Sequence, residues 1–172
     1  MTITASPMAR VDLPDPETAP QLFEGILSRR VFAFLIDLVL LGVISTIILI
    51  VGVVAGFLTF GLGWLAVPIV VPLAILGYYV ATLGSPMRAT VGMQAMDIVL
   101  TPARGQPLDG WSILVHPIVF WITVWLAWPI SLVVALLTPR RETVQDLIAG
   151  TLMVRRSPMV KHWRNVAGAR AS

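Results

Sequence analysis

The sequence contains no cysteine and few charged residues. Lys, Arg, Asp and Glu together make up 12% of the 172 residues, about half of the share that is usual in soluble globular domains. Without cysteine the chain forms no disulfides and no thiolate metal sites, so the sequence carries no sign of the redox state of its compartment. The scarcity of charge excludes an ordinary soluble domain.

Long apolar segments make up most of the chain. Hydrophobic residues account for 57% of it, and the mean hydropathy is +0.87. Between residues 31 and 83 the only side chain charged at neutral pH is Asp37, and between residues 111 and 138 the only group that titrates near neutrality is His116. Uncharged apolar runs longer than about 18 residues are typical of membrane spans. The sequence therefore predicts an integral membrane protein.

Three apolar segments are candidate spans, over about residues 31–55, 64–83 and 111–137. A short, uncharged turn with two glycines separates the first two, so we expect an antiparallel hairpin of transmembrane helices. The third segment, of about 27 residues, is long enough for one crossing and too short for two. Pro117 and Pro129 allow it to break and return to the side from which it entered. The predicted fold class is an all-α membrane protein with a helical hairpin and a third hydrophobic region, either complete or re-entrant.

The positions of the cationic residues predict the orientation of the hairpin. Arg29 and Arg30 precede the first span, Arg88 and Arg104 follow the second, and the turn between the spans has no cation. Because loops rich in Lys and Arg stay on the cytoplasmic side, we expect the amino terminus and the 84–110 loop to be cytoplasmic.

The carboxyl-terminal region is also basic, which favours a cytoplasmic end and conflicts with a complete third span. Its cations are Arg140, Arg141, Arg155, Arg156, Lys161, Arg164 and Arg170. Segment length favours three full crossings, whereas charge favours a broken third region, and both interpretations stay open. Basic residues concentrated near membrane boundaries predict contact with anionic lipid headgroups, and not with nucleic acid.

The sequence divides into a membrane domain and two tails. Residues 1–28, with four prolines and both signs of charge, are expected to form a flexible cytosolic tail. Residues 157–172 form a basic carboxyl-terminal tail, and residues 29–156 form the membrane domain. Within this domain, residues 95–101 and 151–154 are β-prone, and they are able to pair on the cytoplasmic face.

One short segment has the signature of a helix start. Thr143 and Asp146 have the spacing of a capping box, with aspartate in place of the usual glutamate or glutamine, and Gly150 is placed to end the helix one turn later. This pattern alone gives Asp146 a structural role.

Three features together resemble the RDD family of small bacterial membrane proteins, which is named for one arginine and two aspartates. They are Arg30 with Asp37 seven residues later, the Thr90-Val91-Gly92 element, and the run Gln145-Asp146-Leu147-Ile148-Ala149-Gly150-Thr151. The resemblance extends over roughly residues 28–156. By this match Arg30 is the arginine of the family, and Asp37 and Asp146 are its aspartates.

The resemblance implies a site in a bacterial inner membrane. The principal residues would be Arg30, Asp37 and Asp146, and the supporting residues would be Thr90, Gly92, Arg141, Gln145, Gly150 and Thr151. Family members commonly carry a Thr-Pro-Gly-Lys element and a histidine before the second aspartate. Here valine and methionine replace the proline and the lysine, and glutamine replaces the histidine. A role that needs the lysine or the histidine is therefore not expected of this chain.

Transport of an unidentified small ligand or ion, including cation/proton exchange, is the function that the resemblance implies. On a helix Arg30 and Asp37 share a face, about 10 Å apart along the axis. A charged aspartate within a span costs about 2.5–3.5 kcal/mol on insertion, so Asp37 is expected to face the protein interior or a wet cavity. The alternative is a membrane scaffold or accessory subunit in which Arg30, Asp37 and Asp146 form a structural clamp.

Other chemistry is weakly represented. His116 is expected to be a packed, neutral side chain, and two isolated histidines without cysteine make no metal centre. The sequence has no nucleophile pattern, so no enzyme activity and no cofactor are predicted. Gly52 and Gly56 form a GxxxG element that indicates close helix packing or self-association. Because two or three spans enclose little volume, we expect a homo-oligomer or a membrane-protein partner.

Overall fold

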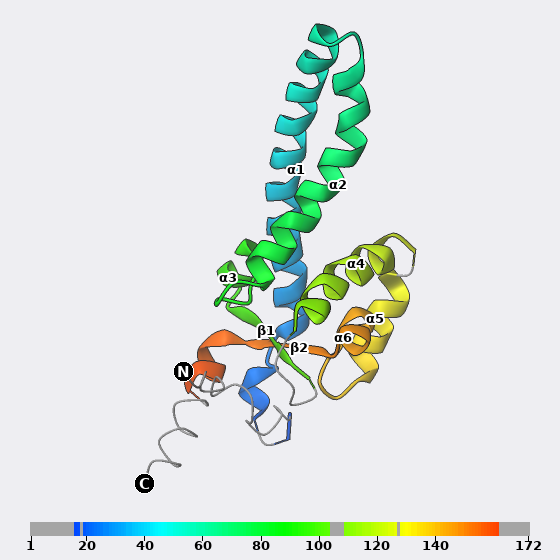
Figure 1. Cartoon of the computed structure of the whole chain (residues 1–172). Coiled ribbons are helices and arrows are strands. Elements are labelled where there is room, and N and C mark those ends of the chain that lie inside the picture. The colour runs from blue at the N-terminus through cyan, green and yellow to red at the C-terminus, as the bar shows by residue number, and fades with distance from the viewer. Residues whose placement is uncertain (1–15, 18, 104–108, 127, 162–172) are drawn as a thin grey trace, which may run out of the picture.

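The computed structural model describes residues 16–17, 19–103, 109–126 and 128–161. Two long helices, α1 (Ile26–Leu58) and α2 (Leu62–Leu83), form an antiparallel hairpin that projects from a smaller base (Figure 1). Both helices are long and apolar enough to cross a membrane. The hairpin predicted from the apolar segments is confirmed.

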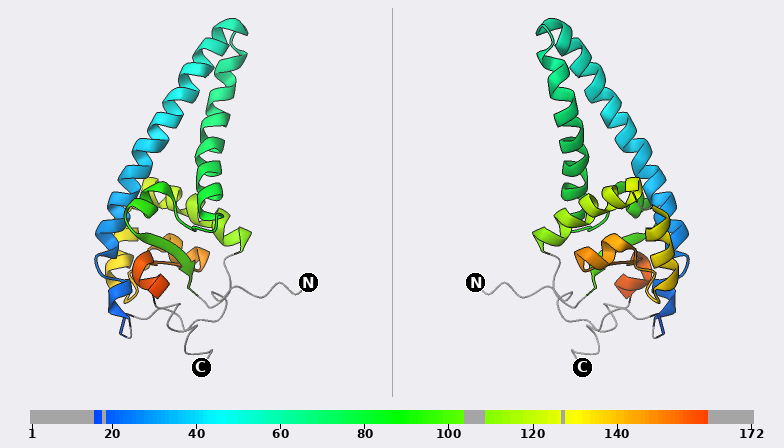
Figure 2. Two further views of the ribbon diagram at one scale, coloured as in Figure 1. Left: turned by 90° about the vertical axis from the view of Figure 1, so that its left-hand side faces the viewer. Right: turned by 90° about the vertical axis from the view of Figure 1, so that its right-hand side faces the viewer.

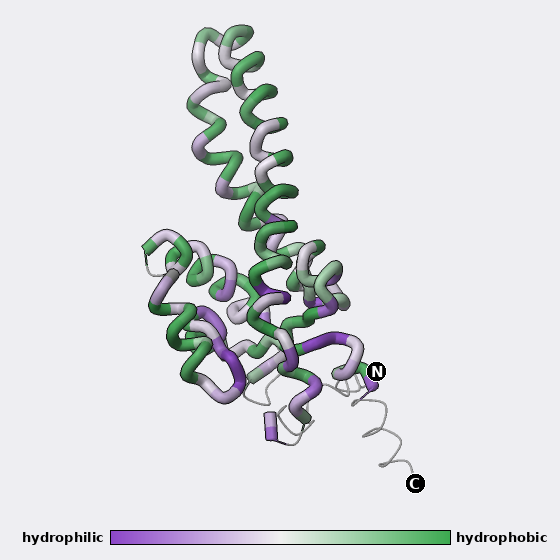
Figure 3. Tube along the Cα trace, turned by 180° about the vertical axis from the view of Figure 1, so that it is seen from behind, coloured by the Kyte–Doolittle hydropathy of each residue, from purple (hydrophilic) through white to green (hydrophobic). Residues whose placement is uncertain are grey.

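The base of the hairpin contains the remaining elements. After α2 follow α3 (Val91–Ala95) and β1 (Ile98–Pro102), and later α4 (Gly110–Leu126), α5 (Trp128–Leu137), α6 (Val144–Ala149) and β2 (Thr151–Arg155). Seen from both sides, α4 lies across the lower end of the hairpin, with the strands and α6 beneath it (Figure 2). Most residues of the hairpin are hydrophobic, and the most hydrophilic residues are concentrated in the base (Figure 3).

The third hydrophobic region is broken. The helical segments 110–126 and 129–137 meet at an angle of 114°, so they do not form one straight span. Strand β1, before this region, pairs with β2, after it. This pairing brings the two ends of the third region together. A re-entrant region, which enters and leaves a membrane on one side, would have this form, and it would fit the basic charge at both ends of the region.

The two β-prone segments pair as expected. Strands β1 and β2 are antiparallel, with Ile98 opposite Arg155 and Pro102 opposite Thr151. One face of this ribbon, with Ile98 and Leu100, packs against the base of the hairpin. The other face contributes Val99, Leu152 and Val154 to a second, smaller hydrophobic cluster.

This second cluster also includes residues of the predicted amino-terminal tail. The 3₁₀ helix η2 (Pro20–Leu22) contributes the buried Leu22, and Ala19 and Phe23 are also buried in the cluster. Helix α1 begins at Ile26, within the segment that was expected to be tail. The apolar side chains of Ala19, Leu22 and Phe23 cover the outer face of the sheet. Residues 1–15, residue 18 and residues 162–172 of the predicted tails lie outside the described residues, as does Arg104.

Glycines allow the two hairpin helices to approach closely near the turn. A Cβ atom on Gly52 would overlap the side chain of Val67, and one on Gly56 would overlap the indole of Trp64. On the facing helix, a Cβ atom on Gly63 would overlap the backbone of α1. The GxxxG element therefore serves packing within the chain, between α1 and α2.

This packing predicts opposite effects for two glycine substitutions in α2. Gly63→Ala forces the helices apart, and we expect it to lower the melting temperature by several degrees, as a loss of about 1–2 kcal/mol would. Gly77→Ala is the matched control, because no atom lies within 4 Å of the added Cβ and alanine is the better helix former by about 1 kcal/mol. Thermal unfolding in detergent measures both. Equal melting temperatures for the two variants would contradict the close approach.

Candidate functional site

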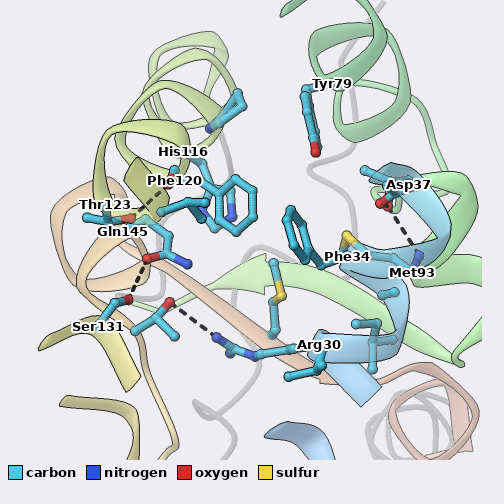
Figure 4. Close-up of a pocket in the computed structure, with 18 of the residues that line it drawn as sticks. Arg30, Phe34, Asp37, Tyr79, Met93, His116, Phe120, Thr123, Ser131 and Gln145 are labelled. Carbon is cyan, nitrogen blue, oxygen red and sulfur yellow. Dashed lines mark hydrogen bonds between the residues drawn. The ribbon is translucent and has the colours of Figure 1, made fainter. Parts of the chain in front are cut away.

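A cavity of about 210 Å³ lies at the base of the hairpin. Figure 4 shows that its walls come from the lower part of the hairpin on one side and from α4, α5 and α6 on the other. Most of the lining side chains are apolar. The polar residues among them are Arg30, Asp37, Thr90, His116, Thr123, Ser131, Thr143 and Gln145.

Asp37 lies on one wall of the cavity and is held by three hydrogen-bond donors. Its side chain accepts from the hydroxyl of Tyr78 at 2.6 Å and from the backbone N–H of Gly92 at 2.8 Å, both at Oδ1. Its Oδ2 accepts from the hydroxyl of Thr90 at 2.6 Å. The residue is 3% exposed. None of these donors is a cation, and none of the ion pairs among the described residues includes Asp37.

The start of α3 fixes the direction of these hydrogen bonds. Thr90 is the N-cap of α3, and its Oγ1 accepts from the N–H of Met93 at 3.1 Å. The hydroxyl of Tyr78 accepts from the N–H of Val91 at 3.0 Å. Each hydroxyl therefore receives a backbone proton and directs its own proton to Asp37. The carboxyl group is therefore held in place by three donors from two different parts of the chain.

Gly92 is required at the closest approach of α3 to α1. A Cβ atom at this position would overlap the carbonyl oxygen of Ala33 and lie 2.9 Å from Cγ of Asp37. Only glycine lets its N–H reach the carboxylate at 2.8 Å. Thr90 and Gly92, both predicted as supporting residues, are thus direct partners of Asp37.

Asp146 occupies a second polar site. Its Oδ2 accepts hydrogen bonds from Nη1 of Arg30 and from both the N–H and the hydroxyl of Thr143, the latter two at 3.0 and 2.9 Å. The predicted capping box of α6 is confirmed, and Gly150 ends the helix in the left-handed conformation, with φ of 65°. Asp146 is completely buried, and it joins the start of α6 to helix α1.

Charge keeps the Asp146 site ionised. Burial raises the pKa of Asp146, but the positive charge of Arg30 and the hydrogen bonds of Thr143 outweigh this effect and hold the pKa below its usual value. The Arg30–Asp146 pair therefore forms a unit with no net charge. Arg30 retains two buried groups without a hydrogen-bond partner, Nε and Nη2.

His116 extends the network around Asp146, a contact that the sequence did not reveal. Its Nδ1 lies 3.0 Å from the hydroxyl of Thr151, and this hydroxyl donates to Oδ1 of Asp146 at 3.4 Å. The direct distance from Nδ1 to the carboxylate is 3.7 Å. The sequence predicted a packed histidine, and its side chain is indeed buried. No local pattern links His116 on α4 to residues that follow α6.

The remaining predicted residues divide between the cavity and the surface. Gln145 accepts a hydrogen bond from Ser131 at 3.1 Å through Oε1, and its amide nitrogen points into the cavity (Figure 4). Arg141 is exposed, and it is not among the residues that line the cavity. Arg30 and Asp37 line the same cavity, but no ion pair of the described residues joins them. The three principal residues thus form two sites, Arg30 with Asp146 and Asp37 with neutral donors.

These positions can be compared with a known family. The sequence profile of the RDD family matches residues 25–150, which is well over half of the chain. The chain belongs to the RDD family. No curated protein and no solved structure matched it. The family match includes both polar sites of this RDD protein, and it ends at Gly150, one residue before Thr151.

Proposed function

We propose that this RDD protein transports a small ligand or ion across a bacterial inner membrane, by exchanging a cation for a proton at Asp37. The single observation that carries the proposal is the environment of Asp37. This carboxylate is buried beside a cavity, receives three neutral donors, and has no counter-charge among the described residues. An intramembrane carboxylate without a positively charged partner is a candidate for ion or proton binding.

A charge count supports exchange. Arg30 and Asp37 line the cavity, and Asp146, behind the lining, pairs with Arg30, so the anionic form of Asp37 gives these three residues together one negative charge in excess. In a medium of low dielectric constant such a charge is neutralised by a proton or by a bound cation. Because one carboxylate accepts only one of them at a time, binding of a cation would release a proton.

The proposal includes the placement of the protein. The basic residues around the base, among them Arg29 and Arg88, orient the base and the amino terminus toward the cytoplasm and toward anionic lipid headgroups. The cavity then opens at the inner side of the membrane. A pathway to the other side requires more helices than one chain supplies, so the transporting form is a homo-oligomer or a complex with another membrane protein. The proposal involves no catalysed reaction.

One observation favours a second candidate, a scaffold or accessory subunit. The Arg30–Asp146 pair links α1 to α6 and uses the capping box to do so. A protein with this clamp alone would hold the shape of its base and would carry nothing across the membrane. Stoichiometric recovery of one membrane-protein partner, together with inert proteoliposomes, would favour this candidate.

Proteoliposomes with an imposed pH gradient test the transport proposal. Inorganic and organic monovalent cations are added in turn to vesicles that contain the wild-type protein. We expect at least one of these cations to collapse the pH gradient. Asp37→Asn should insert and melt similarly, because the introduced amide still accepts from Tyr78 and Gly92, but it should transport no faster than empty vesicles. Asp97→Asn is the control, because Asp97 does not line the cavity and its carboxylate accepts a hydrogen bond from the hydroxyl of Ser157. A gradient that no cation collapses, or full activity in Asp37→Asn, would contradict the proposal.

A further inference from the structure

We infer that the cavity binds a hydrophobic monovalent organic cation, which is a protonated amine or a quaternary ammonium ion with an apolar substituent. Asp37 supplies the negative charge and the aromatic rings of three helices supply the walls. The inference rests on the proposed function, and it names the chemical class of the transported cation. It depends on four features: the uncompensated charge, the aromatic walls, the lack of a cluster of acidic residues among the described residues and the size of the cavity.

The first feature is the position of the charge. Asp37 lines the cavity with a carboxylate that already accepts three hydrogen bonds. An ionised carboxyl group has about four lone-pair sites, so about one site stays free. A single ammonium group needs only one such contact to neutralise the carboxylate. The occupant that complements this wall therefore carries one positive charge.

The second feature is the aromatic lining. Phe34 on α1, Tyr79 on α2 and Phe120 on α4 all line the cavity. The rings of Phe34 and Phe120 meet edge to face with centroids 5.5 Å apart, and those of Tyr79 and Phe120 are 6.4 Å apart. In Figure 4 the ring of Phe34 lies between Phe120 and Asp37, and the hydroxyl of Tyr79 points toward the space above Phe34. Aromatic faces attract desolvated cations, and quaternary ammonium groups are the ligands that such walls suit best.

The third feature excludes two other kinds of occupant. A divalent metal cation is usually held by more than one carboxylate, and the described residues contain no group of three or more acidic or histidine side chains that could hold one. An anion could reach the unpartnered donors of Arg30, but it would add a second uncompensated negative charge to that of Asp37. The apolar walls would also have to solvate it. A cation with its own apolar surface meets neither obstacle.

The fourth feature is size. The cavity has a volume of about 210 Å³, and an apolar cavity of roughly 150 Å³ accepts a benzene molecule. One aromatic ring with a small ammonium group therefore fits. Benzyltrimethylammonium has this form. Its neutral isostere, neopentylbenzene, has a carbon atom in place of the nitrogen, so the two molecules differ in charge and hardly in shape.

Calorimetric binding to the full chain in detergent tests the inference with these two probes. We expect the wild-type protein to bind benzyltrimethylammonium at least about tenfold more tightly than neopentylbenzene, a ratio that the coulombic attraction between a desolvated cation and a carboxylate can supply. Asp37→Asn should abolish this preference and still bind neopentylbenzene, which shows that the cavity has kept its shape. Asp97→Asn should behave as the wild type.

The aromatic walls are tested separately. Phe120→Leu should weaken the binding of benzyltrimethylammonium about threefold to tenfold, the range of one cation–π contact, and should change that of neopentylbenzene by less than about twofold. An equal loss for both probes would show that the ring only fills space, and it would remove the aromatic part of the inference.

The outcomes separate the inference from the proposed function. Equal affinity for the two probes, or tighter binding of phenylacetate than of benzyltrimethylammonium, would overturn the inference. If sodium collapses the pH gradient in proteoliposomes and the organic cation does not bind, the inference is wrong and the transport proposal stands. If the organic cation binds through Asp37 and no cation collapses the gradient, the ligand class stands and the transport proposal is wrong.

Discussion

Arg30→Met is expected to destabilise the protein by about 3–5 kcal/mol, because it leaves the carboxylate of Asp146 buried without its counter-charge. Asp146 is completely buried, and the side chain of Arg30 is only 11% exposed, so water can replace little of the lost interaction. Methionine keeps much of the apolar stem of arginine and lacks its charged group. The effect therefore reports the lost charge rather than lost packing. Thermal or chemical unfolding in detergent measures it.

Arg29→Met is the matched control for this experiment. Arg29 precedes Arg30 on the same helix and donates to the backbone carbonyl of Met96 at 2.7 Å, so its replacement should cost about 1 kcal/mol. The double variant Arg30→Met/Asp146→Asn removes both charges, and it should be more stable than Arg30→Met alone. If Arg30→Met melts like Arg29→Met, or if the double variant is no more stable than the single one, the ion pair is not what holds α1 to α6.

Gly92→Ala is expected to disrupt the Asp37 site by displacing α3 from α1. The added methyl group meets the carbonyl oxygen of Ala33 and the carboxyl carbon of Asp37, and both belong to the packed face of α1. The backbone must move, which costs about 1–3 kcal/mol and lengthens the hydrogen bonds from Gly92 and Thr90. We expect a lower melting temperature together with a loss of cation exchange. Unfolding in detergent and flux in proteoliposomes measure the two effects.

Gly42→Ala, on α1, provides the control, because no atom lies within 4 Å of the new Cβ. It should leave stability unchanged or raise it. A double-mutant cycle with Asp37→Asn tests the route of the damage. If Gly92→Ala acts through the donors of Asp37, the two substitutions are coupled and their effects on stability do not add. Strict additivity would show that the glycine serves helix packing independently of the carboxylate.

Local patterns in the sequence predict most of the fold. The lengths of the apolar runs predict the hairpin, and the β-prone segments at residues 95–101 and 151–154 predict the strands. The capping box at Thr143 and Asp146 and the stop at Gly150 follow from residue types at fixed spacings. Each of these features depends on neighbours in the chain, and a single sequence contains that information.

The partner of Arg30 depends instead on tertiary structure. Helical periodicity correctly places Arg30 and Asp37 on one face, but side chains on a helix lean toward its amino terminus. The long side chain of Arg30 accordingly extends away from Asp37, toward Asp146, which lies more than a hundred residues later in the chain. The contact of His116 with Thr151 likewise joins separate elements. The sequence alone does not decide whether the third hydrophobic region is broken, because proline permits a break without requiring one.

The pairing of β1 with β2 sets the order in which the molecule can be completed during synthesis. Residue 98 is paired with residue 155, and at about 5–20 residues per second the ribosome needs roughly 3–11 seconds to make the segment between them. Throughout that time the hairpin can already be in the bilayer, while β1 has no partner and α4, α5 and α6 are absent or unpaired. The Asp37 carboxylate meets its donors on α2 and α3 early, whereas Arg30 waits for Asp146. The nascent protein therefore passes through a stage in which the cavity wall with Asp37 is in place, while the opposite wall, from α4, α5 and α6, has not yet formed.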